Sequence, residues 1–234
     1  MTDKVVGVIG GMGPEATVDL MMRVIRATPA EDDIDHIRML VDNNPQVPSR
    51  IKAIIEGTGE SPAPCMAQMA RNLAASGADF LVIPCNTAHY YYDEVCRAVD
   101  IPVMNMIDVT VETVLNENAS IRTVGLLASK AVLLTGIYTK PFKGKGVDVI
   151  YPCPEVQELL MASVCKIKTG KYDIGDREVL QSAAEELVRK RAEALIVACT
   201  ELSIICDGLD AGVKVYDSSQ VLAESIVRMA KGRG

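Results

Sequence analysis

Two of the seven cysteines stand in turns whose residue types could move protons. Cys85 lies in the run Pro84-Cys-Asn-Thr-Ala-His89, and Cys199 lies in Ala198-Cys-Thr-Glu201, about half the chain further on. Each cysteine follows a short apolar run that predicts a strand and precedes a stretch that predicts a helix. Because a helix N-terminus and nearby hydroxyl or amide donors stabilise a thiolate, we expect both settings to lower the thiol pKa from its ordinary value of about 8.5.

A pair of thiols could act on opposite faces of one carbon atom. Removing a proton from one face and returning one to the other requires two acid/base groups, one charged and one protonated. Two similar lobes that each contribute one cysteine would supply such a pair. The alternative for any single cysteine is a small buried hydrophobic residue. We expect that packing role for the remaining five, Cys65, Cys96, Cys153, Cys165 and Cys206.

Short β-branched runs alternate along the chain with longer segments of helical period, which predicts βα units around parallel sheets. The expected strands cover Val5–Ile9, Arg38–Val41, Phe80–Ile83, Val103–Met104, Thr123–Leu127, Val147–Ile150, Leu195–Ala198 and Val213–Tyr216. The expected helices cover Glu15–Arg26, Cys65–Ala75, Tyr91–Val99, Val109–Asn116, Glu155–Lys168, Asp176–Lys190 and Gln220–Met229. Both cysteines then follow the carboxyl end of a strand, where open α/β sheets bind ligands.

A polar stretch from Leu115 to Arg122 separates two halves that each read strand, helix, strand, helix. We therefore expect an α/β protein of two similar lobes, each with a central, mostly parallel sheet flanked by helices. The first lobe is predicted to comprise residues 1–115 and 217–234, with the last helix returning to it. The second is predicted to comprise residues 116–216. Cys85 would belong to the first lobe and Cys199 to the second.

Composition excludes several classes of function. The formal net charge is −7 with both signs interspersed, which argues against a nucleic-acid partner. No apolar run reaches the roughly 18 residues of a membrane helix, and the N-terminus lacks a signal-peptide pattern, so we expect a cytoplasmic protein without a membrane partner. In that reducing compartment, an odd number of cysteines without a C-x-x-C pair predicts free thiols. Two histidines and no metal-ligand spacing among the cysteines predict no metal site.

The glycine-rich segment Gly7 to Ala16 has two interpretations. Gly11-x-Gly13-x-x-Ala16 after a strand fits a relaxed dinucleotide-binding fingerprint, with Asp42 placed to hold a ribose. The commoner use is a tight turn whose backbone N–H groups line a pocket and bind an anion. Pro14 stiffens the turn, and the segment after Asp42 is unusual for an adenosine pocket, which favours the tight turn.

Four polar residues also have two interpretations each. Arg50 could grip a carboxylate with two parallel hydrogen bonds, or it could be a solvated surface charge. Lys168, at the end of a predicted helix, could bind an anion or simply favour the helix C-terminus. Glu201 could cap the helix after Cys199 or orient the thiol. His89 could act beside Cys85, or it could be an ordinary residue of the first helical turn.

Taken together, four motifs resemble the aspartate/glutamate racemase family, most closely its archaeal-type aspartate racemases. The motifs are Gly10-Gly-Met-Gly-Pro-x-Ala-Thr17, Asn43-Asn-Pro-Gln-x-Pro-x-Arg50, Pro84-Cys-Asn-Thr-Ala-His89 and Cys199-Thr-Glu201. They occur in the order and spacing of the family and extend over nearly the whole chain. One departure is Ala198, which stands where the family usually has glycine and whose methyl group could reshape the pocket.

The resemblance implies a two-lobed α/β fold with the active site in the cleft between the lobes, no pyridoxal phosphate, no metal or other cofactor, and commonly a homodimer. By position, Cys85 and Cys199 would be the two proton donors and acceptors. The implied substrate-binding residues are Arg50, Asn86, Thr87, Lys168 and Thr200, with Met12 and Glu201 in support. Two cations suit a dicarboxylate, so the expected substrate is an acidic amino acid, aspartate ahead of glutamate.

Other functions remain open from the sequence. Relatives with similar lobes include maleate cis-trans isomerases and hydantoin racemases, which the presence of both cysteines does not exclude. A non-catalytic amino-acid-binding module would use the same hinged lobes. A dinucleotide-dependent enzyme would use the glycine-rich turn.

Overall fold

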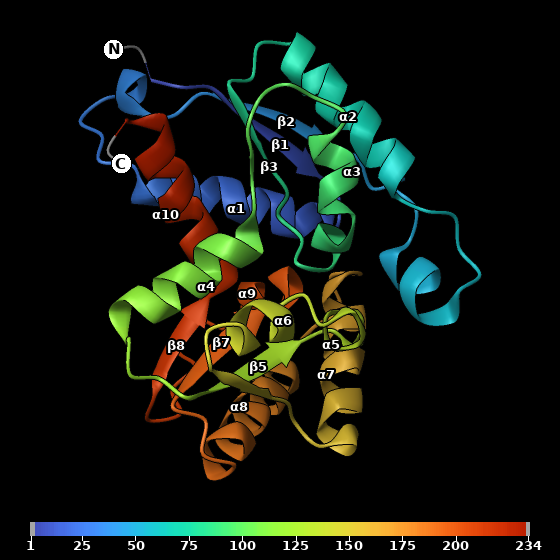
Figure 1. Ribbon diagram of the computed structural model, residues 1–234, viewed down its shortest axis with the longest axis vertical. Helices are drawn as coiled ribbons and strands as arrows, with labels where there is room; N and C mark the ends of the chain where they lie inside the picture. The colour runs from blue at the N-terminus through green and yellow to red at the C-terminus, as the bar shows by residue number, and fades with distance from the viewer. Residues whose placement is uncertain (1–2, 233–234) are drawn as a thin grey trace. The chain divides into compact units, whose positions relative to one another are not determined.

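The computed structural model describes residues 3–232 and divides the chain into two compact units. The first unit comprises the chain up to Val109 and again from Ser219, and the second runs from Thr110 to Ser218. The chain passes from one unit to the other inside α4 (Met106–Glu117) and returns at the start of α10 (Ser218–Ala230). Each unit is built around a four-stranded parallel sheet, drawn as arrows in Figure 1.

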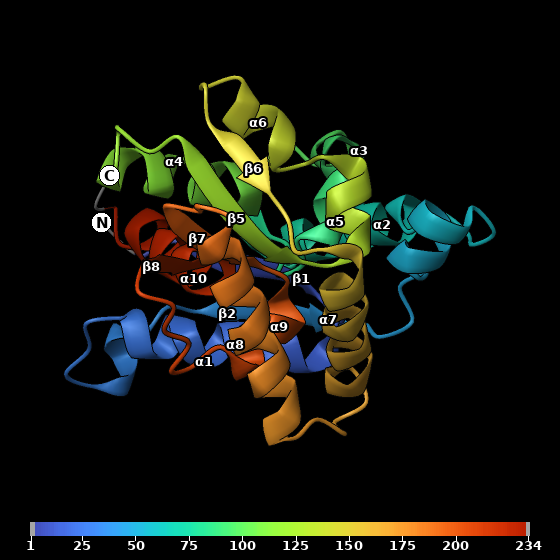
Figure 2. The same cartoon turned by 90° about the horizontal axis from the view of Figure 1, so that it is seen from below.

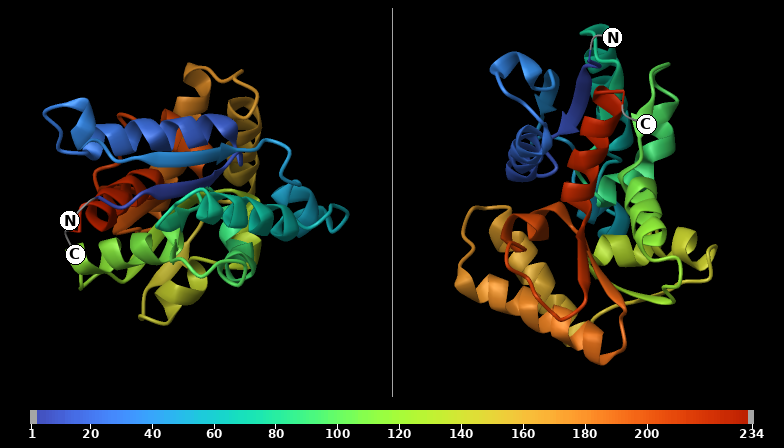
Figure 3. Two further views of the ribbon diagram at one scale, coloured as in Figure 1. Left: turned by 90° about the horizontal axis from the view of Figure 1, so that it is seen from above. Right: turned by 90° about the vertical axis from the view of Figure 1, so that its left-hand side faces the viewer.

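The sheet of the first unit has the strand order β2-β1-β3-β4. Its strands are β1 (Val6–Gly10), β2 (Met39–Asn43), β3 (Phe80–Val82) and β4 (Val103–Met104). Val6 and Val8 pack with α1 (Pro14–Ala27) and α10 on one face. Ile9 packs with α2 (Ala63–Ala75) and α3 (Tyr92–Cys96) on the other. Figure 3 gives two further views of the backbone of these elements. Strand side chains alternate between faces, so both faces of this strand are buried.

The sheet of the second unit has the order β6-β5-β7-β8. Its strands are β5 (Thr123–Ala128), β6 (Asp148–Ile150), β7 (Ala194–Ala198) and β8 (Lys214–Asp217). Leu127, Leu195 and Val197 pack against α7 (Pro154–Ile167), α8 (Ile174–Arg189) and α9 (Thr200–Ile205), which Figure 2 shows together on one side of the sheet. The unit also contains α5 (Lys130–Thr135) and α6 (Thr139–Lys143).

The two sheets repeat one topology, in which the first strand is central and the third strand lies on the opposite side of it from the second. The chain therefore reverses its winding direction between β1 and β3, and again between β5 and β7. Ligands of open α/β sheets bind at the carboxyl ends of the strands that flank such a reversal. Cys85 follows β3 and Cys199 follows β7, so the two cysteines stand at equivalent positions of the repeat.

The predicted α/β fold of two lobes with parallel sheets is confirmed, and all eight expected strands occur within two residues of their predicted ends. The short helices α5 and α6 were not expected, because segments of six and five residues are too brief to display a helical period. The expected helix Tyr91–Val99 is shorter than predicted. A 3-10 helix, η3 (Thr87–Tyr91), precedes it, and α3 ends at Cys96.

Further short elements are a 3-10 helix at Asp33–Asp35 and a π-helix at Lys52–Glu56. Within residues 3–232, every helix is too short or too polar to traverse a lipid bilayer.

The glycine-rich turn after β1 is packed against its own unit. The Gly11 N–H donates to Thr17 Oγ1 at 2.9 Å, and the Thr17 hydroxyl donates to the Gly13 carbonyl at 3.0 Å. Gly11 has φ +88°, and a β-carbon added there would lie 2.1 Å from the Asn44 carbonyl oxygen. The segment therefore forms a tight turn that brings the backbones after β1 and β2 into contact.

We expect Gly11→Ala to destabilise the protein far more than Gly57→Ala. Both glycines have positive φ, but no atom lies within 4 Å of a β-carbon built at Gly57. The Gly57 change should cost about 1 kcal/mol of unfolding free energy, from backbone strain alone. The Gly11 change adds a clash with backbone and should cost roughly 3 kcal/mol or more. Urea unfolding of both variants measures the two costs, and equal losses would contradict the packing argument.

Candidate active site

Cys85 is held in the hydrophobic core at the end of the first unit's sheet. Its side chain is 5% exposed and packs in one cluster with Met12, Val47 and Ile83. Its N–H donates to the Ile83 carbonyl at 2.8 Å, which turns the chain immediately after β3. Met12, expected to support the site, therefore contributes to the apolar wall around Cys85.

The segment after Cys85 differs from the prediction. No α-helix begins directly after the thiol: Asn86 caps the 3-10 helix η3, and α3 starts only at Tyr92. The aligned dipoles of a five-residue 3-10 helix are few, so the expected stabilisation by an α-helix N-terminus is wrong for Cys85. Asn86 is buried and Thr87 is half-buried, and both directly follow the thiol in this turn.

His89 is tied to the backbone on both sides of its ring. Nδ1 lies 2.9 Å from the Cys85 carbonyl oxygen, and the Met106 N–H donates to Nε2 at 3.0 Å. A carbonyl only accepts and an amide N–H only donates, so Nδ1 carries the hydrogen and the ring is neutral. Burial lowers the His89 pKa to about 4, in agreement with a neutral ring. His89 thus lies in the first helical turn after Cys85, with each ring nitrogen bonded to the main chain.

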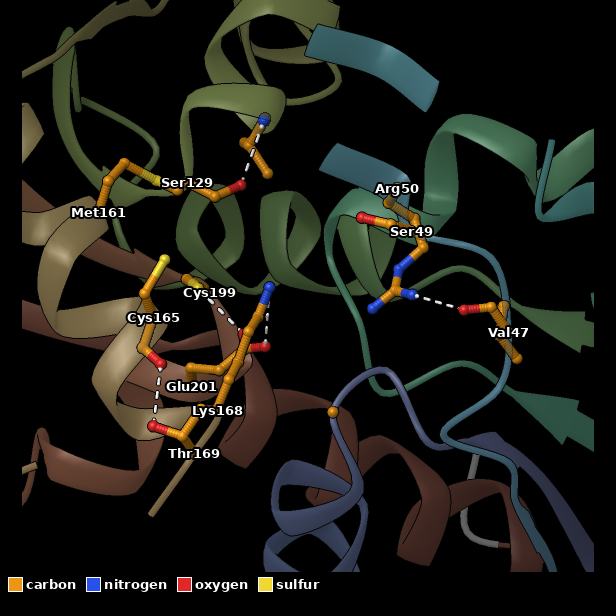
Figure 4. Close-up of polar contacts among 12 residues, drawn as sticks. Val47, Ser49, Arg50, Ser129, Met161, Cys165, Lys168, Thr169, Cys199 and Glu201 are labelled. Carbon is orange, nitrogen blue, oxygen red and sulfur yellow. Dashed lines mark hydrogen bonds and ion pairs between the residues drawn. The ribbon is translucent and has the colours of Figure 1, made fainter. Parts of the chain in front are cut away.

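Arg50 lies in the loop after β2 and is anchored to that loop. One guanidinium nitrogen, Nη1, donates to the carbonyls of Pro48 at 3.2 Å and Val47 at 3.4 Å, the second of which is drawn in Figure 4. Its Nε–H is buried and has no hydrogen-bond partner among the described residues 3–232. Arg50 is thus a half-buried cation with an unused donor rather than a solvated surface charge. Such a donor is available to an anionic ligand.

Cys199 is the N-cap residue of α9 and is 5% exposed. Its thiol donates to Glu201 Oε2 at 3.2 Å, and Glu201 Oε1 lies 3.8 Å from Lys168 Nζ. Lys168 is the C-cap residue of α7. Figure 4 shows the three side chains in sequence, thiol to carboxylate to ammonium. Of the two roles considered for Glu201, the contact with the thiol is the one observed.

The pKa of the Cys199 thiol is raised well above its usual value, opposite to the prediction. Burial is the largest cause, because an apolar environment disfavours the charged thiolate, and the Glu201 carboxylate adds to it. A hydrogen bond from the Leu202 N–H and the charge of Lys168 act in the other direction without overcoming these causes. The sequence argument counted the helix N-terminus but not the desolvation, which only the packed structure reveals.

Thr200, the first residue of α9, carries a second unused donor. The residue is 2% exposed, and its Oγ1 has no hydrogen-bond partner in the part of the chain that the structure describes. Within residues 3–232, five buried side-chain polar atoms lack a partner. Two of them, Thr200 Oγ1 and Arg50 Nε, belong to residues that the sequence assigned to substrate binding. Unpaired buried polar groups are costly, and a bound ligand is one explanation for their retention.

The remaining cysteines are less buried than predicted. Cys65, Cys96, Cys153 and Cys206 are intermediate in burial, and Cys165 is exposed, so the prediction of a buried packing role is wrong for Cys165. Cys85 and Cys199 are the two buried thiols. In the described part of the chain, no group of three or more His, Cys, Asp or Glu side chains could hold a metal ion.

Comparison with known proteins identifies what this arrangement is similar to. The sequence matches the family described as Asp/Glu/Hydantoin racemase over residues 9–226. A broad specificity amino-acid racemase of Bacillus subtilis, RacX, is 28% identical, and the match covers 95% of this chain and 96% of that one.

Solved structures agree with the sequence match. The aspartate racemase of Picrophilus torridus superposes with a TM-score of 0.86 and 31% identity, over 97% of this chain and 94% of that one. An aspartate racemase homologue from Pyrococcus horikoshii OT3, at 24% identity, shares the fold with a TM-score of 0.76, over 97% of this chain and 99% of that one. Family membership supports an isomerase of the racemase type. On these matches, the chain belongs to the Asp/Glu/hydantoin racemase family.

Proposed function

We propose that this protein is a cofactor-independent racemase that interconverts L- and D-aspartate by proton transfer between Cys85 and Cys199. The observation that carries the proposal is the hydrogen bond from the buried Cys199 thiol to the buried carboxylate of Glu201. It keeps one thiol protonated beside a carboxylate, at a strand end equivalent to that of Cys85. The names of the relatives, an aspartate racemase and a broad specificity amino-acid racemase, support this reaction class.

The raised pKa of Cys199 gives the two cysteines different starting roles. Cys199 begins as the thiol and acts as the acid. Cys85 must then be the thiolate, which removes the Cα proton from one face of the substrate while the Cys199 S–H delivers its proton to the other face. The cycle leaves Cys85 protonated and Cys199 as the thiolate, and this second form acts on the other enantiomer. Lys168 offsets part of the negative charge that Glu201 and the Cys199 thiolate then share.

The carbanion formed at Cα needs stabilisation, because no cofactor spreads its charge. Its negative charge moves onto the α-carboxylate, so donors held at that carboxylate lower the barrier. In the proposal, the Thr200 hydroxyl and the polar side chains of Asn86 and Thr87 bind there. Arg50 and Lys168 bind the side-chain carboxylate, with the unused Nε–H of Arg50 as one donor. Exclusion of water from the bound substrate would strengthen each of these contacts.

A broader amino-acid specificity is the second candidate. The racemase of broad specificity from Bacillus subtilis aligns over nearly the full length of both chains. Ala198, fully buried at the end of β7, adds a methyl group directly before Cys199. The proposal of an acidic substrate therefore depends chiefly on the two cations, Arg50 and Lys168. The alternatives of a maleate isomerase and of a binding module without catalysis are separated by the exchange experiment below.

We expect the parent enzyme to form D-aspartate from L-aspartate in deuterated water, with deuterium at Cα. Cys85→Ser and Cys199→Ser should each abolish racemisation, because one proton donor is lost. Each single variant should still exchange the Cα proton of one enantiomer, at a reduced rate, through its remaining thiol, and the two variants should exchange opposite enantiomers. Chiral chromatography and proton NMR measure both quantities.

Cys165→Ser is the matched control, since this exposed cysteine should leave racemisation within about twofold of the parent. If the parent shows neither racemisation nor exchange with every amino acid tried, the racemase function is excluded. Formation of fumarate from maleate would instead favour the isomerase, and tight binding that survives both cysteine substitutions without any turnover would favour the binding module.

We expect Arg50→Gln to lower kcat/KM for aspartate about 100-fold, since a charged hydrogen bond to a carboxylate contributes roughly 1.5–3 kcal/mol. The rate of Cα exchange of the neutral analogue asparagine should change less than about threefold, because asparagine has no side-chain carboxylate for Arg50 to bind. Arg71→Gln is the control, as this arginine is exposed and pairs only locally with Gln68. Equal losses of activity on aspartate and asparagine would show that Arg50 does not recognise the side-chain carboxylate of the substrate.

We expect Glu201→Gln to move ionisation of Cys199 to lower pH. The carboxylate disfavours the neighbouring thiolate, so a neutral amide removes one cause of the raised pKa. In the parent, alkylation of Cys199 should become fast only well above the usual pKa of a cysteine thiol. In the variant, it should rise at lower pH. Iodoacetamide labelling followed by peptide mass spectrometry measures the profile, with exposed Cys165 as internal reference, and an unchanged Cys199 profile would contradict this account.

A further inference from the structure

We propose that His89 is a positioning residue, which holds the backbone of Cys85 in place through its Nδ1–H. The inference rests on the proposed racemase reaction and deepens it, because it assigns the Cys85 half of that reaction a supporting group. The observations are the two hydrogen bonds of the ring, to the Cys85 carbonyl and from the Met106 N–H. Both hydrogen bonds join the ring to main-chain atoms, so His89 acts through the main chain.

The ring of His89 is restrained by burial and stacking as well as by its two hydrogen bonds. It is buried, and the ring of Tyr92 stacks on it with centroids 6.0 Å apart and planes 12° from parallel. The Tyr92 hydroxyl donates to the Val103 carbonyl of β4 at 2.7 Å, which ties the stacking partner to the sheet. A side chain locked by packing and hydrogen bonds holds a reactive group more accurately than a loop does alone.

The position of Cys85 follows from this anchor. The Cys85 N–H is bonded to Ile83 and its carbonyl to His89, so the peptide groups on both sides of the thiol-bearing carbon are restrained. The His89 N–H in turn donates to the Asn86 carbonyl at 3.1 Å, which closes the turn that also carries Thr87. Proton transfer is sensitive to such restraint, since a misplacement of about 1 Å can reduce a rate by about 100-fold.

The other end of the ring reaches the beginning of α4. Met106 is the first residue of that helix, and its N–H is one of the amides that an α-helix leaves without an internal acceptor. His89 Nε2 supplies the acceptor. The chain leaves the first unit within α4. The His89 ring therefore bonds both to the turn that carries Cys85 and to the first residue of this helix. If His89 had only a structural role, the bond from the Met106 N–H would be the one that matters.

Two substitutions separate the two bonds of the ring. His89→Asn places an amide nitrogen near the position of Nδ1 and can keep the bond to the Cys85 carbonyl, but it loses the acceptor for Met106. His89→Gln places an amide oxygen near the position of Nε2 and can keep the bond from Met106, but it loses the donor to Cys85. Each is combined with Cys199→Ser, where only Cys85 exchanges protons, and with Cys85→Ser, where only Cys199 does.

In the Cys199→Ser background, we expect His89→Gln to slow Cα deuterium exchange at least tenfold through kcat, with KM within about threefold. His89→Asn should stay within about threefold of its parent. In the Cys85→Ser background, neither substitution should change exchange more than about threefold. Solvent-deuterium exchange measured by proton NMR gives all four rates, and circular dichroism with thermal unfolding shows that each variant is folded.

Equal loss in the two backgrounds, or a tenfold loss for His89→Asn, would overturn the proposal in favour of a structural role. If His89→Gln fails to fold, the exchange rate of His89→Asn still tests the proposal. This variant keeps the bond to the Cys85 carbonyl, so the proposal requires it to keep Cα exchange in the Cys199→Ser background. Failure of the racemase function itself appears earlier and separately, as the absence of exchange in the two single-cysteine parents that carry His89.

Discussion

The candidate site depends on the parallel pairing of β1 with β3 and of β5 with β7. In the first sheet Val6 pairs with Phe80 and Val8 with Val82, and in the second Val124 pairs with Ala194 and Ala128 with Ala198. Adjacent parallel strands end at the same edge of a sheet. The glycine-rich turn and Cys85 therefore leave one edge, while Ser129 and Cys199 leave the corresponding edge of the other sheet. A slip in either register would displace a thiol together with its donors.

Burial affects the pKa of the Cys199 thiol more than the adjacent helix N-terminus does. Cys199 stands before a helix of six residues, yet desolvation and Glu201 raise its pKa. A thiol of this kind is a poor nucleophile at rest and a strong base once ionised, which suits abstraction of a weakly acidic Cα proton. The Lys168 ammonium beside Glu201 limits the electrostatic cost of that ionised form. In the proposed reaction, burial and the Glu201 carboxylate together favour the protonated thiol at rest and make the thiolate a stronger base.

Unused polar groups connect the fold to its ligand. The Nε–H of Arg50 and the hydroxyl of Thr200 are buried without a hydrogen-bond partner among residues 3–232. His89 illustrates the opposite case, in which a buried ring has a partner at each nitrogen. The protein therefore combines fully satisfied groups that hold the backbone with unsatisfied groups suited to an anion. This division is typical of preorganised sites.

The sequence by itself determined the strands, the two-lobed α/β class and the position of both cysteines at strand ends. Those features follow from local period and from β-branched runs bounded by turn residues, which are properties of neighbouring residues. The motifs around Arg50, Cys85 and Cys199 likewise pointed to a racemase family, to which the chain belongs.

Only the tertiary structure decided the environment of each group. The raised pKa of Cys199 and the replacement of an α-helix by a 3-10 helix after Cys85 differ from what local sequence predicts, and the tautomer of His89 is not predicted by it at all. Each depends on atoms distant in the chain or on complete removal of water. Met106, for example, lies far along the chain from the ring nitrogen to which it donates. Spacing identifies which residues can do chemistry, whereas burial and long-range contacts determine their charge and orientation.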